Sequence, residues 1–507
     1  MKRSEQSPGS PIDGVSADVF RPREGWLRKA RGLFSGVGAL VLLCAGGVYV
    51  GPRLWCGPLQ SGISYRDGEC VGVTDGSYVF DSAFTQIQQK IEAENDRVVQ
   101  TGSASVKVAL FTQLTPSEST AMSPEQVLRS LEGAYAAQKR ANSSRDIGDP
   151  TPLIQLYLAN AGGRQEHWEP IVDTLVAMSD DSAPLLAVVG LGVSIQATAD
   201  TADRLSQHRI PMVSAVTSAD ELNDETFPGL IRVGPSNTDY VKALRGYVED
   251  HDELATAVLV YDENDPDLYV ASLTKAFGAQ MGEYTHGNPP QPFYGTALDE
   301  ESSPSLFHVV TQNICQTGAD MALYAGRGVD LDALIDALHV RPCLDEPLSV
   351  LVAESGLGMH TDQEVLDKLK KSNITVVHAS ASDPEWHRGG PGVPDGFSGL
   401  HEAYEEYVGD PASGLVNGYA VAHHDAVLTA VKAIRLHNRK EGVTAASAEE
   451  VRKSLFRLNS QHSVGGAGGT LSFSKTRGGD PGGKVVPVIE IPRADGDEPR
   501  LYTTPKE

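Results

Sequence analysis

The sequence has few cysteines and too few basic residues to balance its acidic ones. Five cysteines occur among 507 residues, so the fold does not rest on a dense disulfide framework. With 42 Lys and Arg against 67 Asp and Glu, the net charge is −25 at pH 7. Such an excess of acid excludes a general nucleic-acid binder and argues against adhesion to anionic lipid through the bulk surface. Hydrophobic residues make up 40%, enough for real cores, and the length suggests about two to four structural units.

The N-terminal segment differs from the rest of the chain in charge. Residues 1–32 are net basic, and the following run Leu33–Val50 contains no charged residue. Its length corresponds to roughly 27 Å of helix, close to the thickness of a bilayer core. Trp26 and Trp55 flank the run, as interfacial aromatic residues often do. We predict a cytoplasmic tail followed by an uncleaved signal anchor over residues 33–51, and hence a single-pass protein of the cytoplasmic membrane with its N-terminus inside and its main body outside.

Two other interpretations of this segment stay open. A cleaved signal peptide would have a shorter apolar run and a clean A-x-A site after it, and neither is present. A lipoprotein anchored at Cys44 would have a small residue directly before the cysteine, where Leu43 stands.

The four cysteines outside the apolar run are even in number, which suits an oxidising compartment. Cys56 and Cys70 bracket a short Gly-rich loop and are natural partners, which leaves Cys315 and Cys343 as a second bridge. The other two pairings stay open. A metal site is the weaker interpretation, because no C-x-x-C or Cys/His spacing accompanies these residues.

From Val106 onward, short apolar runs alternate with helical patterns, and a second such series begins after about residue 250. This order is typical of parallel sheets with helices on both faces. We therefore predict an α/β fold with two doubly wound parallel-sheet lobes, a hinge and an interlobe cleft, preceded by one transmembrane helix. The predicted parts after the anchor are a juxtamembrane connector with a disulfide loop and a helix over 52–104, lobe 1 over 105–250, lobe 2 over 251–411, a return to lobe 1 over 412–464, and a final crossing with a closing hairpin and tail over 465–507.

Four parts of the sequence resemble one known family. These are VKVALFTQLT from Val106, LEGAYAAQKRAN from Leu131, VVGLGVSIQATA with IPMVSAVTSADEL, and NGYAVAHHDAVLTAVKAI with GGTLSFSKTRGGD. Residues 106–495 resemble the type I periplasmic-binding-protein fold, especially the branched-chain amino-acid-binding proteins of ABC transporters, in the membrane-anchored form of Gram-positive actinobacteria. The resemblance implies a ligand clamped between two lobes, and crossings of the chain near residues 250, 412 and 465.

The resemblance places ligand contacts after strands of lobe 1. Ser194 begins a helix, where its hydroxyl and the helix N–H groups could hold a carboxylate, and a plain helix cap is the alternative. Val216, Thr217 and Ser218 follow the next strand, where family members bind the α-amino and carboxylate groups of the ligand. A solvated turn or cap is the alternative there. Thr115 in the first loop is a further candidate.

Lobe 2 offers two candidates. Tyr269 stands where the family has a Tyr-Gly pair whose aromatic ring closes over the ligand, but Val270 replaces the glycine. Glu354 follows another strand and could bind an ammonium group, with an exposed loop carboxylate as the alternative. No arginine-plus-acid pair that would fix an α-amino acid is evident, so the ligand class stays open.

Catalytic motifs are missing from the sequence. It has no G-x-S-x-G elbow and no Walker loop, and the G-L-G-V-S-I stretch at Gly190 lacks the third glycine of a dinucleotide fingerprint. His423, His424 and Asp425 are adjacent on a predicted helix, so they point in different directions, which favours a structural role over a metal site. We therefore predict no enzyme, no cofactor and no bound metal.

The predicted function is that of a membrane-anchored, extracytoplasmic solute-binding protein. It would clamp a small polar, amino-acid-like ligand, either for an ABC permease or as a sensor. The alternative is a protein-interaction module that keeps the fold without a ligand. The lost glycine after Tyr269, and Val216 where alanine is frequent, favour this alternative.

Overall fold

The computed structural model describes Cys56 and residues 62–117, 120–264, 267–296, 307–438, 446–494 and 498–506. Residues Gln60–Glu507 form one compact unit, and a second unit, Met1–Leu59, is described only at Cys56. The predicted basic tail and signal anchor, residues 1–51, lie outside the described residues.

The predicted localisation needs a correction. Within the described ranges, no helix is both long and apolar enough to cross a membrane. The two longest, α3 (Pro124–Ser143) and α13 (Tyr419–Asn438), have 20 residues each but carry charged side chains along their length, whereas a spanning helix needs about 20 predominantly apolar residues. This finding contradicts the prediction of a single-pass protein of the cytoplasmic membrane.

The first sheet of the described chain has the strand order β1-β2-β4-β3-β5-β6-β7. Its strands are β1 (Ile63–Arg66), β2 (Glu69–Thr74), β3 (Ser105–Thr112), β4 (Leu153–Asn160), β5 (Leu185–Gly190), β6 (Met212–Ser214) and β7 (Leu230–Arg232). β3 to β7 pair in parallel, as their apolar runs predict. β2 pairs antiparallel with both β1 and β4.

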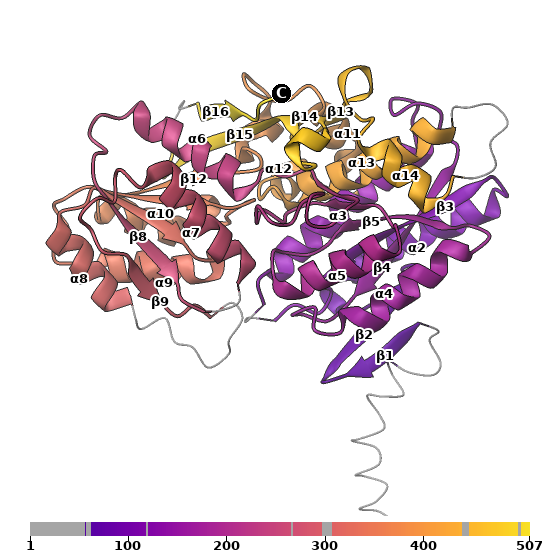
Figure 1. Cartoon of the computed structure of the whole chain (residues 1–507), viewed down its shortest axis with the longest axis horizontal. Helices are drawn as coiled ribbons and strands as arrows, with labels where there is room; N and C mark the ends of the chain where they lie inside the picture. The colour runs from indigo at the N-terminus through magenta and orange to yellow at the C-terminus, as the bar shows by residue number, and fades with distance from the viewer. Residues whose placement is uncertain are drawn as a thin grey trace, which may run out of the picture. The chain divides into compact units, whose positions relative to one another are not determined.

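Both faces of this sheet are buried. Along β3, Val108 and Leu110 enter one core while Ala109 and Phe111 enter the other, because successive side chains of a strand point to opposite faces. One face is covered by α2 (Thr85–Gln100), α3, α13 and α14 (Ala448–Leu455), and the other by α4 (Trp168–Ala177) and α5 (Gln196–Gln207), as Figure 1 shows. At the N-terminus of α3, Ser123 is the N-cap residue in a capping box and Pro124 stands in the first turn.

The second sheet has the order β13-β14-β15-β12-β11-β10-β8-β9, with β16 on β15. Its strands are β8 (Ala257–Asp262), β9 (Gln291–Phe293), β10 (Met321–Ala325), β11 (Leu348–Ala353), β12 (Ile374–Ala379), β13 (Val464–Gly466), β14 (Gly469–Ser472), β15 (Gly482–Ile491) and β16 (Arg500–Thr503). β8 to β12 are parallel. β15 is antiparallel to β12, β14 and β16, because the closing hairpin returns along the sheet. The sheets are therefore mixed: the strands of the strand–helix alternation are parallel, as predicted, and antiparallel strands are added to them.

Helices also cover both faces of the second sheet. These are α6 (Asn237–Glu249) and α7 (Leu268–Met281) on one face, and α8 (Phe307–Thr317), α9 (Gly328–His339) and α10 (Gln363–Lys371) on the other. α11 (Phe397–Tyr407) packs on α3, and the short α12 (Pro411–Gly414) follows it. The chain passes from the first core to the second between β7 and α6, returns after β12, and crosses again between β14 and β15.

One predicted disulfide is directly visible. Cys315 in α8 is bonded to Cys343 beyond α9, with their Cα atoms 5.6 Å apart, which confirms the predicted pairing. Cys56 and Cys70 are also disulfide-bonded. All four predicted cysteines therefore take part in disulfides.

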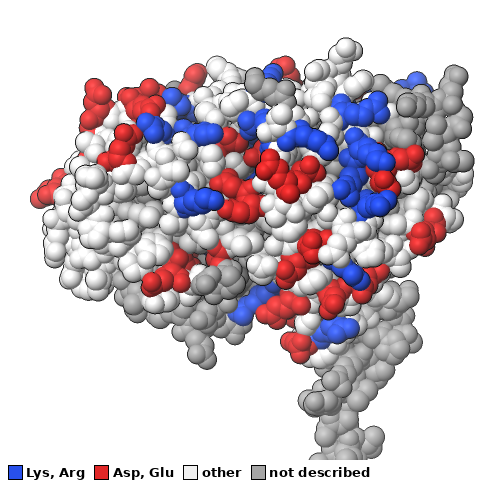
Figure 2. All heavy atoms as spheres, in the orientation of Figure 1, with Lys and Arg blue, Asp and Glu red and all other residues white. Residues whose placement is uncertain are grey.

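Acidic and basic side chains are interspersed on the face shown in Figure 2. The part of this face near α8, a helix without charged residues, is mostly uncharged. The basic groups on this face are broken up by acidic ones and do not form the continuous basic stripe of a nucleic-acid binder.

Candidate functional site

Loops at the carboxyl ends of strands from both sheets enclose one small cavity. Its lining residues are Ala121, Val193, Ser194, Val216, Ser218, Tyr269, Arg327, Glu354, Ser355 and Tyr419. Ligands of open α/β sheets bind beyond the carboxyl ends of the strands, so this cavity is the candidate site. It measures about 20 Å³, which is room for about one water molecule.

Most of the predicted ligand-binding residues meet at this cavity, namely Ser194, Val216, Ser218, Tyr269 and Glu354. Two others lie elsewhere. The hydroxyl of Thr217 donates to Oγ of Ser214 at 2.6 Å, and the hydroxyl of Thr115 donates to Oε2 of Glu69 at 2.6 Å. The structure thus brings five candidates together, and their role in ligand binding stays a prediction.

Ser194 joins two loops of the first sheet and does not cap its own helix. The N-cap residue of α5 is Ile195, and no side chain caps that helix. The hydroxyl oxygen of Ser194 accepts hydrogen bonds from the backbone N–H groups of Ser218 at 3.0 Å and Ala219 at 3.1 Å. The interpretation of Ser194 as a plain helix cap was therefore wrong. Its own hydroxyl hydrogen remains available for donation to a ligand.

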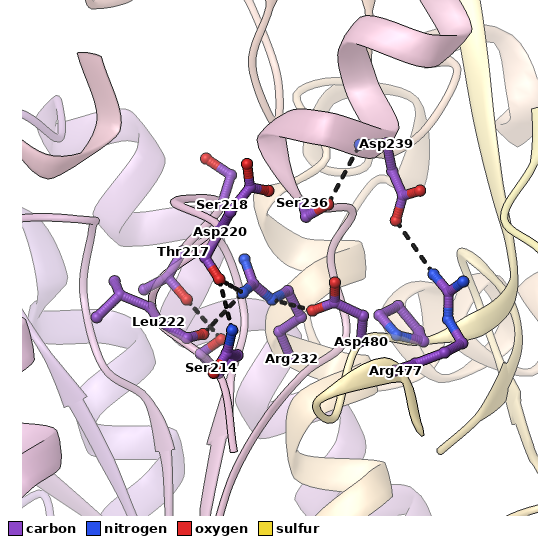
Figure 3. A network of polar contacts seen from close by, with 12 residues as sticks. Ser214, Thr217, Ser218, Asp220, Leu222, Arg232, Ser236, Asp239, Arg477 and Asp480 are labelled. Atoms are coloured by element: carbon purple, nitrogen blue, oxygen red, sulfur yellow. Dashed lines mark hydrogen bonds and ion pairs between the residues drawn. The ribbon is translucent and has the colours of Figure 1, made fainter. Parts of the chain in front are cut away.

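A buried arginine holds the loop that carries Ser218, as Figure 3 shows. Arg232, the last residue of β7, donates to the carbonyl of Ala219 at 3.0 Å and to that of Leu222 at 2.8 Å. Its Nε lies 2.6 Å from Oδ1 of Asp480, on the segment between β14 and β15. Burial raises the pKa of Asp480, and the charge of Arg232 opposes this effect. A fully buried cation is tolerated only when it is paired and hydrogen-bonded, so this network fixes the loop firmly.

Glu354 brings an unsatisfied carboxylate oxygen to the other side of the cavity. Burial raises its pKa to about 7, although the charge of Arg327 and a hydrogen bond from the Gly328 backbone oppose this shift. Its Oε2 atom is buried and has no hydrogen-bond partner in the described part of the chain. A buried acceptor without a donor is costly, so this atom is suited to receive a ligand donor. The alternative of an exposed loop carboxylate was therefore wrong.

Sequence reasoning missed an arginine and an aspartate at this cavity. Arg327 is the N-cap residue of α9, and its Nε and Nη2 atoms lie 2.7 and 2.9 Å from the two carboxylate oxygens of Asp267. Asp267 is itself the N-cap residue of α7 and accepts from the backbone N–H of Tyr269 at 2.9 Å. The guanidinium carbon lies 5.2 Å from the centroid of the Tyr269 ring, a cation–π distance. An arginine-plus-acid pair, which was not evident in the sequence, is therefore present beside the cavity.

The loops of the two sheets touch directly at Ser194. Its carbonyl oxygen accepts a hydrogen bond from the backbone N–H of Tyr269 at 3.2 Å and another from Nη2 of Arg327 at 3.0 Å. The cavity is small because these contacts draw the two sides together. The described structure is therefore a closed arrangement.

A larger cavity of about 470 Å³ lies away from these strand ends, along Ile489 to Ala494. Its charged side chains largely engage each other or near neighbours. Arg388 pairs with Glu385, and Arg493 pairs with Asp383. The smaller cavity is the better candidate because it gathers polar groups from the carboxyl ends of strands of both sheets.

The comparisons with known proteins decide the fold. No family model matches the chain, and no curated protein matches it. Solved structures do match. An ABC transporter substrate-binding protein from Desulfitobacterium hafniense in complex with leucine is 15% identical, with a TM-score of 0.54, over 78% of this chain and 100% of that one.

Two further structures match in the same way. A leucine-binding protein from Thermotoga maritima is 14% identical with a TM-score of 0.55, over 79% of this chain and 99% of that one. A branched-chain amino acid transporter substrate-binding protein from Streptococcus pneumoniae in complex with isoleucine is 14% identical with a TM-score of 0.56, over 79% and 99%. The chain has the periplasmic-binding-protein fold. The predicted resemblance is confirmed to that extent, and a membrane-anchored actinobacterial type is not shown.

The periplasmic-binding-protein fold explains why residues far apart in sequence converge. Ser194, Glu354 and Tyr419 come from different strand–helix units, and parallel strands present all their carboxyl ends at one edge. Arg327 had a detectable signal, because it follows the apolar run of β10 by two residues. Asp267 had none, because it lies in a polar loop like many other acidic residues.

Proposed function

We propose that this protein is an extracytoplasmic solute-binding protein that closes two lobes around a small polar, amino-acid-like ligand. One observation carries the proposal. Five residues that were singled out from the sequence, from loops of both sheets, line one cavity at the strand ends. Fold alone does not settle function, so this site carries the proposal and the structural neighbours only add support for the ligand class and the partner.

The chemistry of the cavity suits a zwitterion. Oε2 of Glu354 is a buried acceptor without a donor, and a ligand ammonium group would supply one. The Ser194 hydroxyl lies beside the start of α5, where a negative charge is favoured by the helix dipole and the free N–H groups. The neighbours whose names mention leucine or isoleucine support an amino acid as the ligand.

The compartment and the partner are part of the proposal. The Cys315–Cys343 disulfide supports a place outside the cytoplasm, where disulfides persist. An ABC permease is the proposed partner, because the neighbours are substrate-binding proteins of such transporters. A sensor that passes closure to another protein would use the same cleft. Neither role involves catalysis.

A thermal-shift screen of the purified full-length chain tests the proposal. At a ligand concentration of 100 times Kd, binding to the folded state adds about 2.7 kcal/mol of stability. We expect at least one amino acid among the common L-amino acids to raise the melting temperature. The double variant Ser194→Ala/Ser218→Ala should lose the shift, while Ser206→Ala, at the far end of α5, should keep it. A panel without any stabiliser would remove the proposal.

One observation favours a second candidate, a protein-interaction module that keeps the fold without a ligand. The cavity holds about one water molecule, and the bonds from Tyr269 and Arg327 to Ser194 close it with the chain's own groups. For this candidate, the closed form would persist at all ligand concentrations and no amino acid would stabilise the protein.

A further inference from the structure

The guanidinium of Arg327 occupies the cleft in the way a ligand would. Arg327 belongs to the second sheet, yet its Nη2 donates to the Ser194 carbonyl of the first at 3.0 Å. The same group pairs with Asp267 and lies over the ring of Tyr269. Only 6% of the residue is exposed. It therefore joins the two sides and takes up part of the space between them.

The hydrogen-bonding capacity that remains in the cleft is small and specific. Nε and Nη2 of Arg327 are used by Asp267 and Ser194, whereas Nη1 forms no hydrogen bond within the described residues. On the same side of the cavity, Oε2 of Glu354 also lacks a hydrogen-bond partner within the described residues. One unused donor edge and one unused acceptor match the carboxylate and the ammonium of a zwitterion.

We infer that Arg327 is the specificity-determining residue of the cleft and restricts the ligand to small zwitterions of the size of glycine or alanine. The inference rests on the proposed function of a solute-binding protein. Its guanidinium takes up part of the cavity between the two sheets, which leaves little room for a ligand side chain, and its unused Nη1 is the donor for the ligand carboxylate. Leucine and isoleucine, which two of the structural neighbours hold, are excluded by size.

The negative charge of the carboxylates around Arg327 also excludes acidic ligands. The single cation of Arg327 faces two carboxylates, the buried Asp267 and the half-buried Glu354, whose Oε2 atom is buried. A ligand with a second carboxylate would add another negative charge to a site that already has more acids than bases. Like charges in a site of low dielectric repel strongly, so glutamate and aspartate are rejected.

Calorimetric titration of the full-length protein with glycine, L-alanine, L-leucine and L-glutamate tests the inference. The wild type should bind glycine and alanine at least roughly tenfold more tightly than leucine, which is within the range that added methylene groups impose. Arg327→Ala should reverse that order, because removal of the guanidinium opens room for an aliphatic side chain. Arg204→Ala, which removes a half-buried arginine of α5 that pairs with Asp173, is the matched control and should keep the wild-type order.

Arg327→Ala leaves Asp267 buried without its cation, so a second variant guards against loss of folding. In Arg327→Met/Asp267→Asn both charges are removed, and asparagine remains a good N-cap for α7. Small-angle scattering without ligand gives an independent readout. Both variants should be more expanded than the wild type, because the bond to the Ser194 carbonyl is lost.

The outcomes separate this inference from the proposed function. Binding by the wild type with an unchanged preference in both variants would overturn the role of Arg327 and leave the solute-binding proposal intact. Equal scattering of ligand-free wild type and variants would also count against the inference. Failure of every amino acid to bind either protein would overturn the proposed function, and the inference would fall with it.

Discussion

The two sides of the cavity use the same kind of loop but hold their polar groups differently. On the side of the first sheet, the Ser194 hydroxyl and the Ser218 loop are joined by backbone hydrogen bonds, with Arg232 behind them. On the side of the second sheet, Glu354 and Arg327 each keep an atom without a hydrogen-bond partner in the part of the chain that the structure describes.

The difference indicates that the two sides have different roles in binding. The first side is preorganised, because its charged groups lie behind the loop and not in the cavity. The second side places charged groups with unused hydrogen-bonding atoms in the cavity, and it is the side on which ligand chemistry and pH act. Predictions that remove charge should therefore have different consequences on the two sides.

The largest effect on stability is expected at the Arg232–Asp480 pair, which supports the loop on the side of the first sheet. Arg232→Met should lower the free energy of unfolding by about 3–5 kcal/mol, because Asp480 stays buried without its cation. Urea denaturation at pH 7 measures this. The double variant Arg232→Met/Asp480→Asn should recover part of the loss. If Arg232→Met cost no more than Arg204→Ala, the picture of a rigid first side would be broken.

A smaller effect of opposite sign is expected on the second side. The pKa of Glu354 rises from 4.5 to about 7 on folding, so the folded protein binds this proton more tightly than the unfolded chain. Stability therefore falls as the pH rises from about 4.5 to 7, and the whole penalty is present above that range. Glu354→Gln should remove up to roughly 3 kcal/mol of this penalty.

Urea denaturation at pH 4 and pH 8 measures the effect of Glu354→Gln. The variant should be more stable than the wild type at pH 8 and nearly equal to it at pH 4. It should also lose affinity for any ligand with an ammonium group. Equal stabilities at both pH values would show that Glu354 is not buried as a charge.

The smallest effect is expected at Ser194. Ser194→Ala removes an acceptor from two buried N–H groups, at a cost of about 1–3 kcal/mol that does not change with pH. Thermal unfolding at pH 5 and pH 8 checks both the size and the absence of a pH dependence. Ser206→Ala, whose hydroxyl bonds to a carbonyl at the protein surface, is the control and should cost less. If the stability lost in Ser194→Ala changed with pH, the Ser194 hydroxyl would interact with the charged groups on the side of the second sheet.

Much of the fold could be predicted from local pattern. The apolar runs at β3 and β5 predict strands buried on both faces, and Ser123 with Pro124 predicts the start of α3. Two strands, β2 in the first sheet and β15 in the second, run antiparallel to their neighbours, and local pattern does not predict this. Neither strand belongs to the strand–helix alternation, so its direction is set by the neighbouring strand that it meets in the folded sheet.

Only one feature of the sequence pointed to residues of the candidate site, namely a position in the loop after a predicted strand. Polar residues directly after strands were found, and five of the seven candidates reach the cavity. Thr217 and Thr115 met the same criterion, but their hydroxyls turn to Ser214 and Glu69. Which way a loop side chain points is decided by packing around it, and no spacing in the sequence records that.

The sequence by itself determined the α/β alternation, the even number of cysteines outside the apolar run, and the strand ends at which polar residues gather. These follow from periodicity and composition along the chain. Only the tertiary structure decided that Arg327 and Asp267 join Glu354, and that Arg327 reaches the Ser194 carbonyl across the cleft. The physical reason is that a buried charge is stable only beside a partner, and the partner is chosen by how the two sheets meet.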